Sequence, residues 1–223
     1  MQFLDAQISQ KLREDFEGLE QPVELLVLTG SHLVLPGKDA TGHQRETLAL
    51  LKEICDLSDK LSLSEMPLAS LPEAREAGIT LAPTTVLRAK GSESLNIRFS
   101  GIPSGYEFQT LIATIMMIGT GESGLSEESK TLIAQVQDRV MIESFVTPTC
   151  PHCPRAVITA FRLAFHNSNI MASGIEASEF PVISQKYRIS GVPDTILSAK
   201  QSSRVLGGQP EGAFVSALLK LPV

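Results

Sequence analysis

The chain has 223 residues, of which 43% are hydrophobic, and a formal net charge of −6. This length suffices for one large domain or two small ones, and the lack of a basic block argues against nucleic acid as a partner. The three cysteines are too few for a disulfide-stapled scaffold, and no apolar run is long enough for a signal peptide or a membrane span, so we expect a cytoplasmic protein.

The spacing of apolar residues predicts the elements of the first half. A helix is expected over residues 6–16, a buried strand over 25–28 and a second helix over 47–57. Pro83 then opens a short β-branched strand, and a Gly-x-Pro-x-Gly step at 101–105 leads to a closing helix over 108–118.

The second half begins after a polar, glycine-bearing stretch. Its expected elements are a linking helix over 130–138, a buried strand over 140–146, a helix over 156–165 and a strand that reaches Glu176. Pro193 opens another short strand. A second Gly-x-Pro-x-Gly step at 208–212 then precedes a closing helix over 214–219.

The two halves therefore end in the same order of elements. Ile79 precedes Pro83 by four residues, and Ile189 precedes Pro193 by four. In each half a turn, a Gly-x-Pro-x-Gly step and a helix follow the proline. Four shared elements in one order predict two copies of one α/β fold, over 1–121 and 122–223, each a central mixed sheet flanked by helices.

The segment Thr147-Pro148-Thr149-Cys150-Pro151-His152-Cys153-Pro154 lies between a predicted strand and a predicted helix. The start of a helix directs unpaired N–H groups and a positive dipole end toward the first sulfur, which favours the nucleophilic thiolate. The second sulfur, three residues later, is within reach to resolve a mixed disulfide. A zinc half-site is the alternative, but a structural zinc needs four ligands and the chain has no second cysteine pair, so we expect no metal.

A strand, a C-x-x-C motif, a helix and a later proline before a strand together resemble the thioredoxin fold. The run 145–157 and the run 101–108 resemble the protein disulfide oxidoreductase family, which consists of glutaredoxin-like proteins with two thioredoxin units. The N-terminal domain of the alkyl hydroperoxide reductase flavoprotein is a related two-unit module. The resemblance covers nearly the whole chain.

The resemblance also suggests roles for residues around the cysteines. Pro193 would be a cis-proline that faces the dithiol, with the Val192 backbone free to pair with an extended substrate; an ordinary turn proline is the alternative. Pro151 and His152 would tune the pair: a charged imidazole would stabilise the thiolate and make the disulfide more oxidising, whereas a solvent-facing His152 would have little effect. Thr149, directly before Cys150, would help to cap the helix and would contact the substrate.

Two acids are candidates for accepting the proton of the resolving thiol. Glu143 lies in the strand before the motif, and Glu176 resembles an acid at the same place in related sequences. A solvated surface position is the alternative for both. The first half departs from the family, because Thr41 and Gln44 stand where a second cysteine pair would be, which predicts a redox-inactive first unit.

The predicted function is a thiol–disulfide oxidoreductase that acts on protein disulfides or dithiols through Cys150 and Cys153, without a cofactor. The family resemblance implies a thioredoxin reductase-like flavoenzyme and peroxiredoxins as partners. Two alternatives stay open: a dedicated electron carrier to a peroxiredoxin-type peroxidase, and a non-catalytic scaffold that binds peptides.

Overall fold

The computed structural model describes residues 3–30 and 42–221. The first half contains α1 (Ala6–Glu17), β1 (Val23–Thr29), α2 (Gly42–Cys55), β2 (Leu61–Pro67), the short 3-10 helix η1 (Leu68–Ser70), α3 (Pro72–Glu76), β3 (Thr84–Ala89), β4 (Ile97–Ser100) and α4 (Glu107–Thr120). The second half contains α5 (Glu127–Ile133), β5 (Val140–Val146), α6 (Cys153–His166), β6 (Ile170–Glu176), α7 (Pro181–Lys186), β7 (Asp194–Ser198), β8 (Ser202–Leu206) and α8 (Glu211–Leu219).

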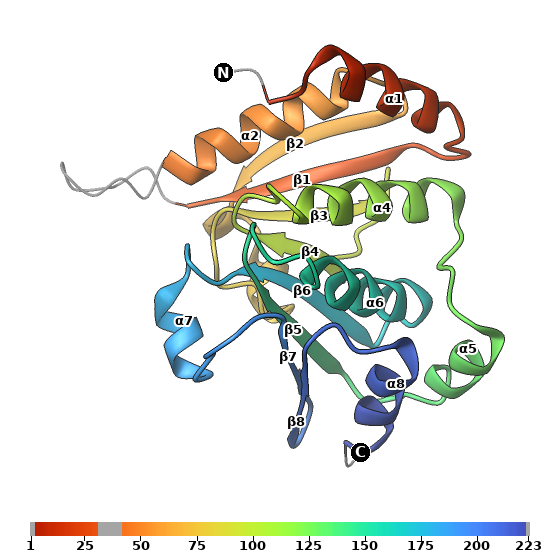
Figure 1. The fold of residues 1–223 in the computed structure, drawn as a ribbon, viewed down its shortest axis with the longest axis vertical. Coiled ribbons are helices and arrows are strands. Elements are labelled where there is room, and N and C mark those ends of the chain that lie inside the picture. The colour runs from red at the N-terminus through yellow and green to blue at the C-terminus, as the bar shows by residue number, and fades with distance from the viewer. Residues whose placement is uncertain (1–2, 31–41, 222–223) are drawn as a thin grey trace.

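All eight strands belong to one mixed sheet, in the order β2-β1-β3-β4-β6-β5-β7-β8 (Figure 1). In each half the first strand pairs parallel with the second and antiparallel with the third, and the third pairs antiparallel with the fourth. The halves join through parallel pairing of β4 with β6. The thioredoxin-like α/β architecture is thus as predicted, with the two four-stranded halves merged into one sheet.

A buried arginine reinforces the junction between the halves. Arg98 on β4 lies opposite Ser173 on β6, and its Nε donates a hydrogen bond of 2.7 Å to the Ser173 hydroxyl. Its Nη1 donates to the Leu95 carbonyl at 3.1 Å. Because the sheet is continuous here, the division into units 1–121 and 122–223 stays a prediction.

The helices divide unequally between the two faces of the sheet. The larger core lies under α1, α2, α4, α5, α6 and α8, where it contains Cys150 and Cys153. The opposite face is covered by α3, which packs on the first half, and by α7. Partly buried apolar side chains of α7 and its flanking loops pack against Phe145, Ile175 and Ile196. Successive residues of a strand point to opposite faces, so strand position decides which core a side chain joins.

Several boundaries differ from the sequence expectations. Helix α2 begins at Gly42, five residues before the predicted start, and the predicted linking helix over 130–138 is instead α5, which ends at Ile133. Ser126 explains the earlier start of α5, because its side chain accepts a hydrogen bond from the Ser129 N–H and so caps the helix. None of the helices in the described ranges combines the length and apolarity that a membrane crossing requires.

Candidate dithiol site

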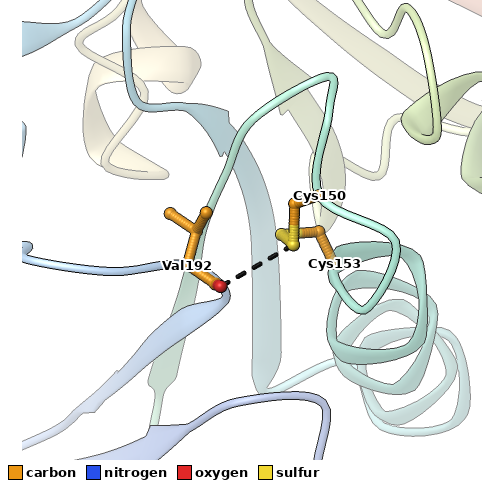
Figure 2. The surroundings of a disulfide bond; sticks show 3 residues. All are labelled: Cys150, Cys153 and Val192. Carbon is orange, nitrogen blue, oxygen red and sulfur yellow. Dashed lines mark hydrogen bonds between the residues drawn. A yellow bond between two sulfur atoms is a disulfide. The ribbon is translucent and has the colours of Figure 1, made fainter.

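The two predicted cysteines lie in the loop that links β5 to α6. Strand β5 ends at Val146 and α6 begins at Cys153. Pro154 lies in the first turn of α6, where a backbone N–H would have no partner within the helix, so its lack of an N–H costs no hydrogen bond. Cys150 and Cys153 form a disulfide with their Cα atoms 5.5 Å apart (Figure 2). The structure therefore represents the oxidised state of the pair.

The two sulfurs differ in their access to solvent. Cys150 is 8% exposed, whereas Cys153 is 0% exposed and packs in the larger core below α6. An incoming partner sulfur can approach only the more exposed atom. Of the two residues, Cys150 is therefore the more accessible and Cys153 the internal one.

The loop before β7 faces the disulfide, as Figure 2 shows for Val192. The Val192–Pro193 peptide bond is cis, and Pro193 is buried. The Sγ of Cys150 lies 3.7 Å from the Val192 carbonyl oxygen. A disulfide sulfur carries no proton, so this contact can be a hydrogen bond only when Cys150 is a thiol.

The other residues of the motif lie at the surface. Thr149, Pro151 and His152 are exposed beside the disulfide. The N-cap position of α6 is His152, and no side chain caps the helix there. At the first two positions of α6, the Cys153 N–H donates a hydrogen bond of 3.4 Å to the Cys150 carbonyl and Pro154 has no N–H.

Loops from both halves approach the backbone of the motif. Gly105 has a φ of +60°, and it lies so close to Pro148 that an added Cβ would be 2.2 Å from the Pro148 carbonyl oxygen. The same oxygen accepts a hydrogen bond of 2.9 Å from the Tyr106 N–H. From the other side, a Cβ at Gly208 would lie 2.9 Å from the His152 carbonyl oxygen. The two Gly-x-Pro-x-Gly steps thus support the dithiol loop.

The structure separates the two candidate acids. Glu143 points to the α7 face of the sheet, where its Oε2 accepts a hydrogen bond of 2.7 Å from the Tyr187 hydroxyl. This is opposite the face that carries α6, so the structure does not bring Glu143 to the dithiol. Burial and this bond raise the pKa of Tyr187 to about 12. Glu176 is buried at the end of β6 on the α6 face, near Pro148 rather than near Glu143.

A third acid, Glu107, was missed by the sequence reasoning. It is the first residue of α4, is 1% exposed, and follows the Tyr106 that binds the motif loop. Within the described residues neither carboxylate oxygen has a hydrogen-bond partner. Burial raises the pKa of Glu107 to about 7, and the nearby Thr110 hydroxyl opposes this shift only in part. The signal in sequence was weak, since a glutamate at a helix start is normally solvated.

Helices α4 and α6 lie side by side, and both begin at the same end of the sheet (Figure 1). Glu107 is the first residue of α4 and Cys153 is the first residue of α6, so the two residues lie at the same end of these neighbouring helices. A buried carboxyl with a pKa near neutrality can hold or release a proton in the pH range where thiols exchange.

The first half contains a counterpart of the site without sulfur. Thr41 lies outside the described residues, but Gln44 is buried in α2 and its Oε1 accepts a hydrogen bond of 3.0 Å from the Gly30 N–H. The Ala82–Pro83 bond is cis, like the bond at Pro193. A glutamine thus fills the space near this proline by binding the backbone, in keeping with the predicted redox-inactive first unit.

The described residues offer no alternative metal or thiol chemistry. Residues 3–30 and 42–221 contain no cluster of three His, Cys, Asp or Glu side chains arranged to hold a metal ion. Cys55 is a half-buried free cysteine of α2, and burial raises its pKa to about 12, which disfavours its thiolate.

Comparisons with known proteins agree with this geometry. Residues 140–220 match the family described as a thioredoxin domain. The alkyl hydroperoxide reductase protein AhpF of Staphylococcus aureus is 29% identical over 202 residues, and that of Pseudomonas aeruginosa is 26% identical over 197 residues. These matches cover 89% and 88% of this chain but 34% of each relative, so the chain spans about a third of their length.

Solved structures show the same similarity over the full fold. The alkylhydroperoxide reductase protein AhpF of Enterococcus faecalis has a TM-score of 0.84 and 27% identity, over 97% of this chain and 100% of that chain. A protein disulfide oxidoreductase from Aeropyrum pernix K1 has a TM-score of 0.82 and 28% identity, over 100% and 97%. Residues 140–220 are thus thioredoxin-like, and the chain is related over most of its length to AhpF and similar in fold to a protein disulfide oxidoreductase.

Proposed function

We propose that the chain is a cytoplasmic thiol–disulfide oxidoreductase that passes electrons between proteins through Cys150 and Cys153. The observation that carries this proposal is the asymmetry of the disulfide-bonded pair, in which Cys150 keeps 8% exposure and Cys153 is completely buried. Such a pair can exchange with a partner at one atom and close internally at the other.

The reduced form would act in two displacement steps. The Cys150 thiolate attacks a partner disulfide, forms a mixed disulfide and releases one partner thiolate. The Cys153 thiolate then attacks the Sγ of Cys150, which restores the disulfide seen here and releases the second partner thiolate. Two electrons pass to the partner, and its two sulfurs take up the protons that the dithiol loses. The same steps in reverse would oxidise a partner dithiol.

Two surrounding groups would assist this exchange. The structure records no hydrogen bond from the Val192 N–H to any described residue, so this group could pair with an extended partner segment beside Cys150. Glu107 is the candidate acceptor for the proton of Cys153, because both residues begin packed helices at the same end of the sheet and burial raises the pKa of Glu107 to about 7.

The relatives favour a peroxidase as the partner that receives the electrons. Those proteins are components of alkyl hydroperoxide reductases. The matches include most of this chain but only about a third of each relative. We therefore propose a peroxiredoxin-type peroxidase downstream and a thioredoxin reductase-like flavoenzyme upstream. The broader activity on protein disulfides is retained as the general form of the same proposal, supported by the similarity to a protein disulfide oxidoreductase.

Trapping tests the proposal. A Cys153→Ser protein should accumulate mixed disulfides at Cys150, because the second displacement is blocked, and mass spectrometry would identify the trapped proteins. The matched control is Cys55→Ser, which removes a cysteine outside the site and should trap nothing beyond the unmodified protein. If Cys150→Ser keeps full biological activity, the redox proposal is wrong and the peptide-binding scaffold is favoured.

A further inference from the structure

An acidic cleft of about 490 Å³ opens beside the dithiol loop. Its charged lining consists of His43 and Glu46 from α2, Glu176 at the end of β6, and Glu179 from the segment after β6. Pro148 forms part of the wall. Pro148 is two residues before Cys150, so their Cα atoms are at most about 8 Å apart along the chain. A partner segment bound at Cys150 would therefore pass close to this cleft.

The carboxylates of the cleft are held in place but incompletely paired. Glu176 is 3% exposed; its Oε2 accepts a hydrogen bond of 2.6 Å from the Glu179 N–H, while its Oε1 has no partner among the described residues. The Glu179 side chain is 7% exposed, and its Oε1 accepts a hydrogen bond of 2.8 Å from the Ile102 N–H. The backbone thus fixes both groups. The unpaired Oε1 of Glu176 is buried beneath the cleft, whereas the Oε2 of Glu179 has no hydrogen-bond donor among the described residues and lies 3.9 Å from His43.

Among the described residues, the acidic groups of the cleft outnumber the basic ones. The Nδ1 of His43 lies 3.9 Å from the Oε2 of Glu46 and 3.9 Å from the Oε2 of Glu179, so one imidazole faces three carboxyl groups. No lysine or arginine of the described chain lines the cleft. A buried carboxylate without a counter-charge is costly, and an incoming cation would remove that cost.

We propose that the acidic cleft binds a lysine or arginine side chain of the partner protein, located within about four residues of the cysteine that exchanges with Cys150. This rests on the proposed function and names a chemical feature of its partners. Arginine fits best, because its planar guanidinium carries several donors that can bind more than one carboxylate. The cleft would select partners by charge while the sulfurs carry out the exchange.

The test uses two synthetic peptides that differ in one functional group. Each carries one cysteine in a mixed disulfide with mercaptoethanol and, three residues away, either arginine or its neutral analogue citrulline. The reduced protein is mixed with each peptide at low salt, and the rate of peptide reduction is followed by chromatography. We expect the arginine peptide to react about fivefold faster, and added salt to lessen this ratio.

Variants assign the preference to the cleft. In Glu179→Gln the amide oxygen can still accept from Ile102, so only the charge is lost, and the ratio should fall to within about twofold of unity. Glu46→Gln changes a half-exposed side chain on α2, so it should not disturb folding, and it should also lower the ratio. Glu128→Gln, an exposed residue of α5, is the matched control and should keep the full ratio.

The outcomes separate this inference from the function on which it rests. Equal rates for the two peptides, or a preference that persists in both Glu179→Gln and Glu46→Gln, would overturn the cleft proposal and leave the redox proposal intact. A rate that calcium chloride suppresses more than sodium chloride at equal ionic strength would instead assign the cleft to a metal ion. Failure to reduce either peptide would refute both proposals.

Discussion

Glu107 should destabilise the folded protein above neutral pH, and Glu107→Gln should remove this effect. The side chain is 1% exposed and neither carboxylate oxygen has a partner among the described residues. Glutamine is neutral at every pH and has nearly the same shape. The substitution therefore tests the cost of the buried charge with little change in packing.

The magnitude follows from the pKa. Burial raises the pKa of Glu107 from 4.5 to about 7, which at about 1.4 kcal/mol per pKa unit corresponds to about 3 kcal/mol. Below pH 4.5 the carboxyl is protonated in both the folded and the unfolded state, so there is no cost. Between pH 4.5 and 7 the unfolded chain releases a proton that the folded protein keeps, so stability falls as pH rises and is constant above.

The assay is urea and thermal unfolding of the oxidised protein at a series of pH values. At pH 8 the variant should exceed the wild type by up to about 3 kcal/mol, or about 6–12 °C in Tm, and the difference should disappear near pH 4. Exposed Glu128→Gln serves as control and should follow the wild type throughout. Parallel pH profiles for wild type and Glu107→Gln would refute the assignment of a raised pKa.

Three further results are expected. Arg98→Lys should lower the free energy of unfolding by about 3 kcal/mol, because an ammonium cannot reproduce the guanidinium bonds to Ser173 and Leu95; a urea-unfolding loss under about 1 kcal/mol would contradict this. Gly105→Ala should destabilise by about 2 kcal/mol or more, since its φ is +60° and the added Cβ meets the Pro148 carbonyl; an unchanged Tm would exclude that contact. In a glutathione titration the Cys150–Cys153 potential should be less negative than about −270 mV, and His152→Leu should make it more negative; no change would show that exposed His152 does not tune the pair.

The sequence by itself determined the elements that depend on local patterns. The apolar run at 140–146 appears as β5 over Val140–Val146, and the C-x-x-C spacing located the disulfide. The helix predicted over 156–165 is α6, which begins three residues earlier, at Cys153. These features depend on strand periodicity and helix-start chemistry, which neighbouring residues supply. The similar endings of the two halves likewise predicted the repeated strand-turn-strand unit, seen as β3 with β4 and β7 with β8.

Tertiary structure alone decided how distant segments meet. No local pattern distinguishes Glu143 from Glu107, yet one residue faces α7 and the other is buried at the start of α4 near the dithiol loop. The pairing of β4 with β6 merges two predicted sheets, and it brings Glu179 to the Ile102 backbone across 77 residues of sequence. Burial, and with it pKa and reactivity, depends on packing from the whole chain, so sequence spacing could identify the sulfurs but not the acids around them.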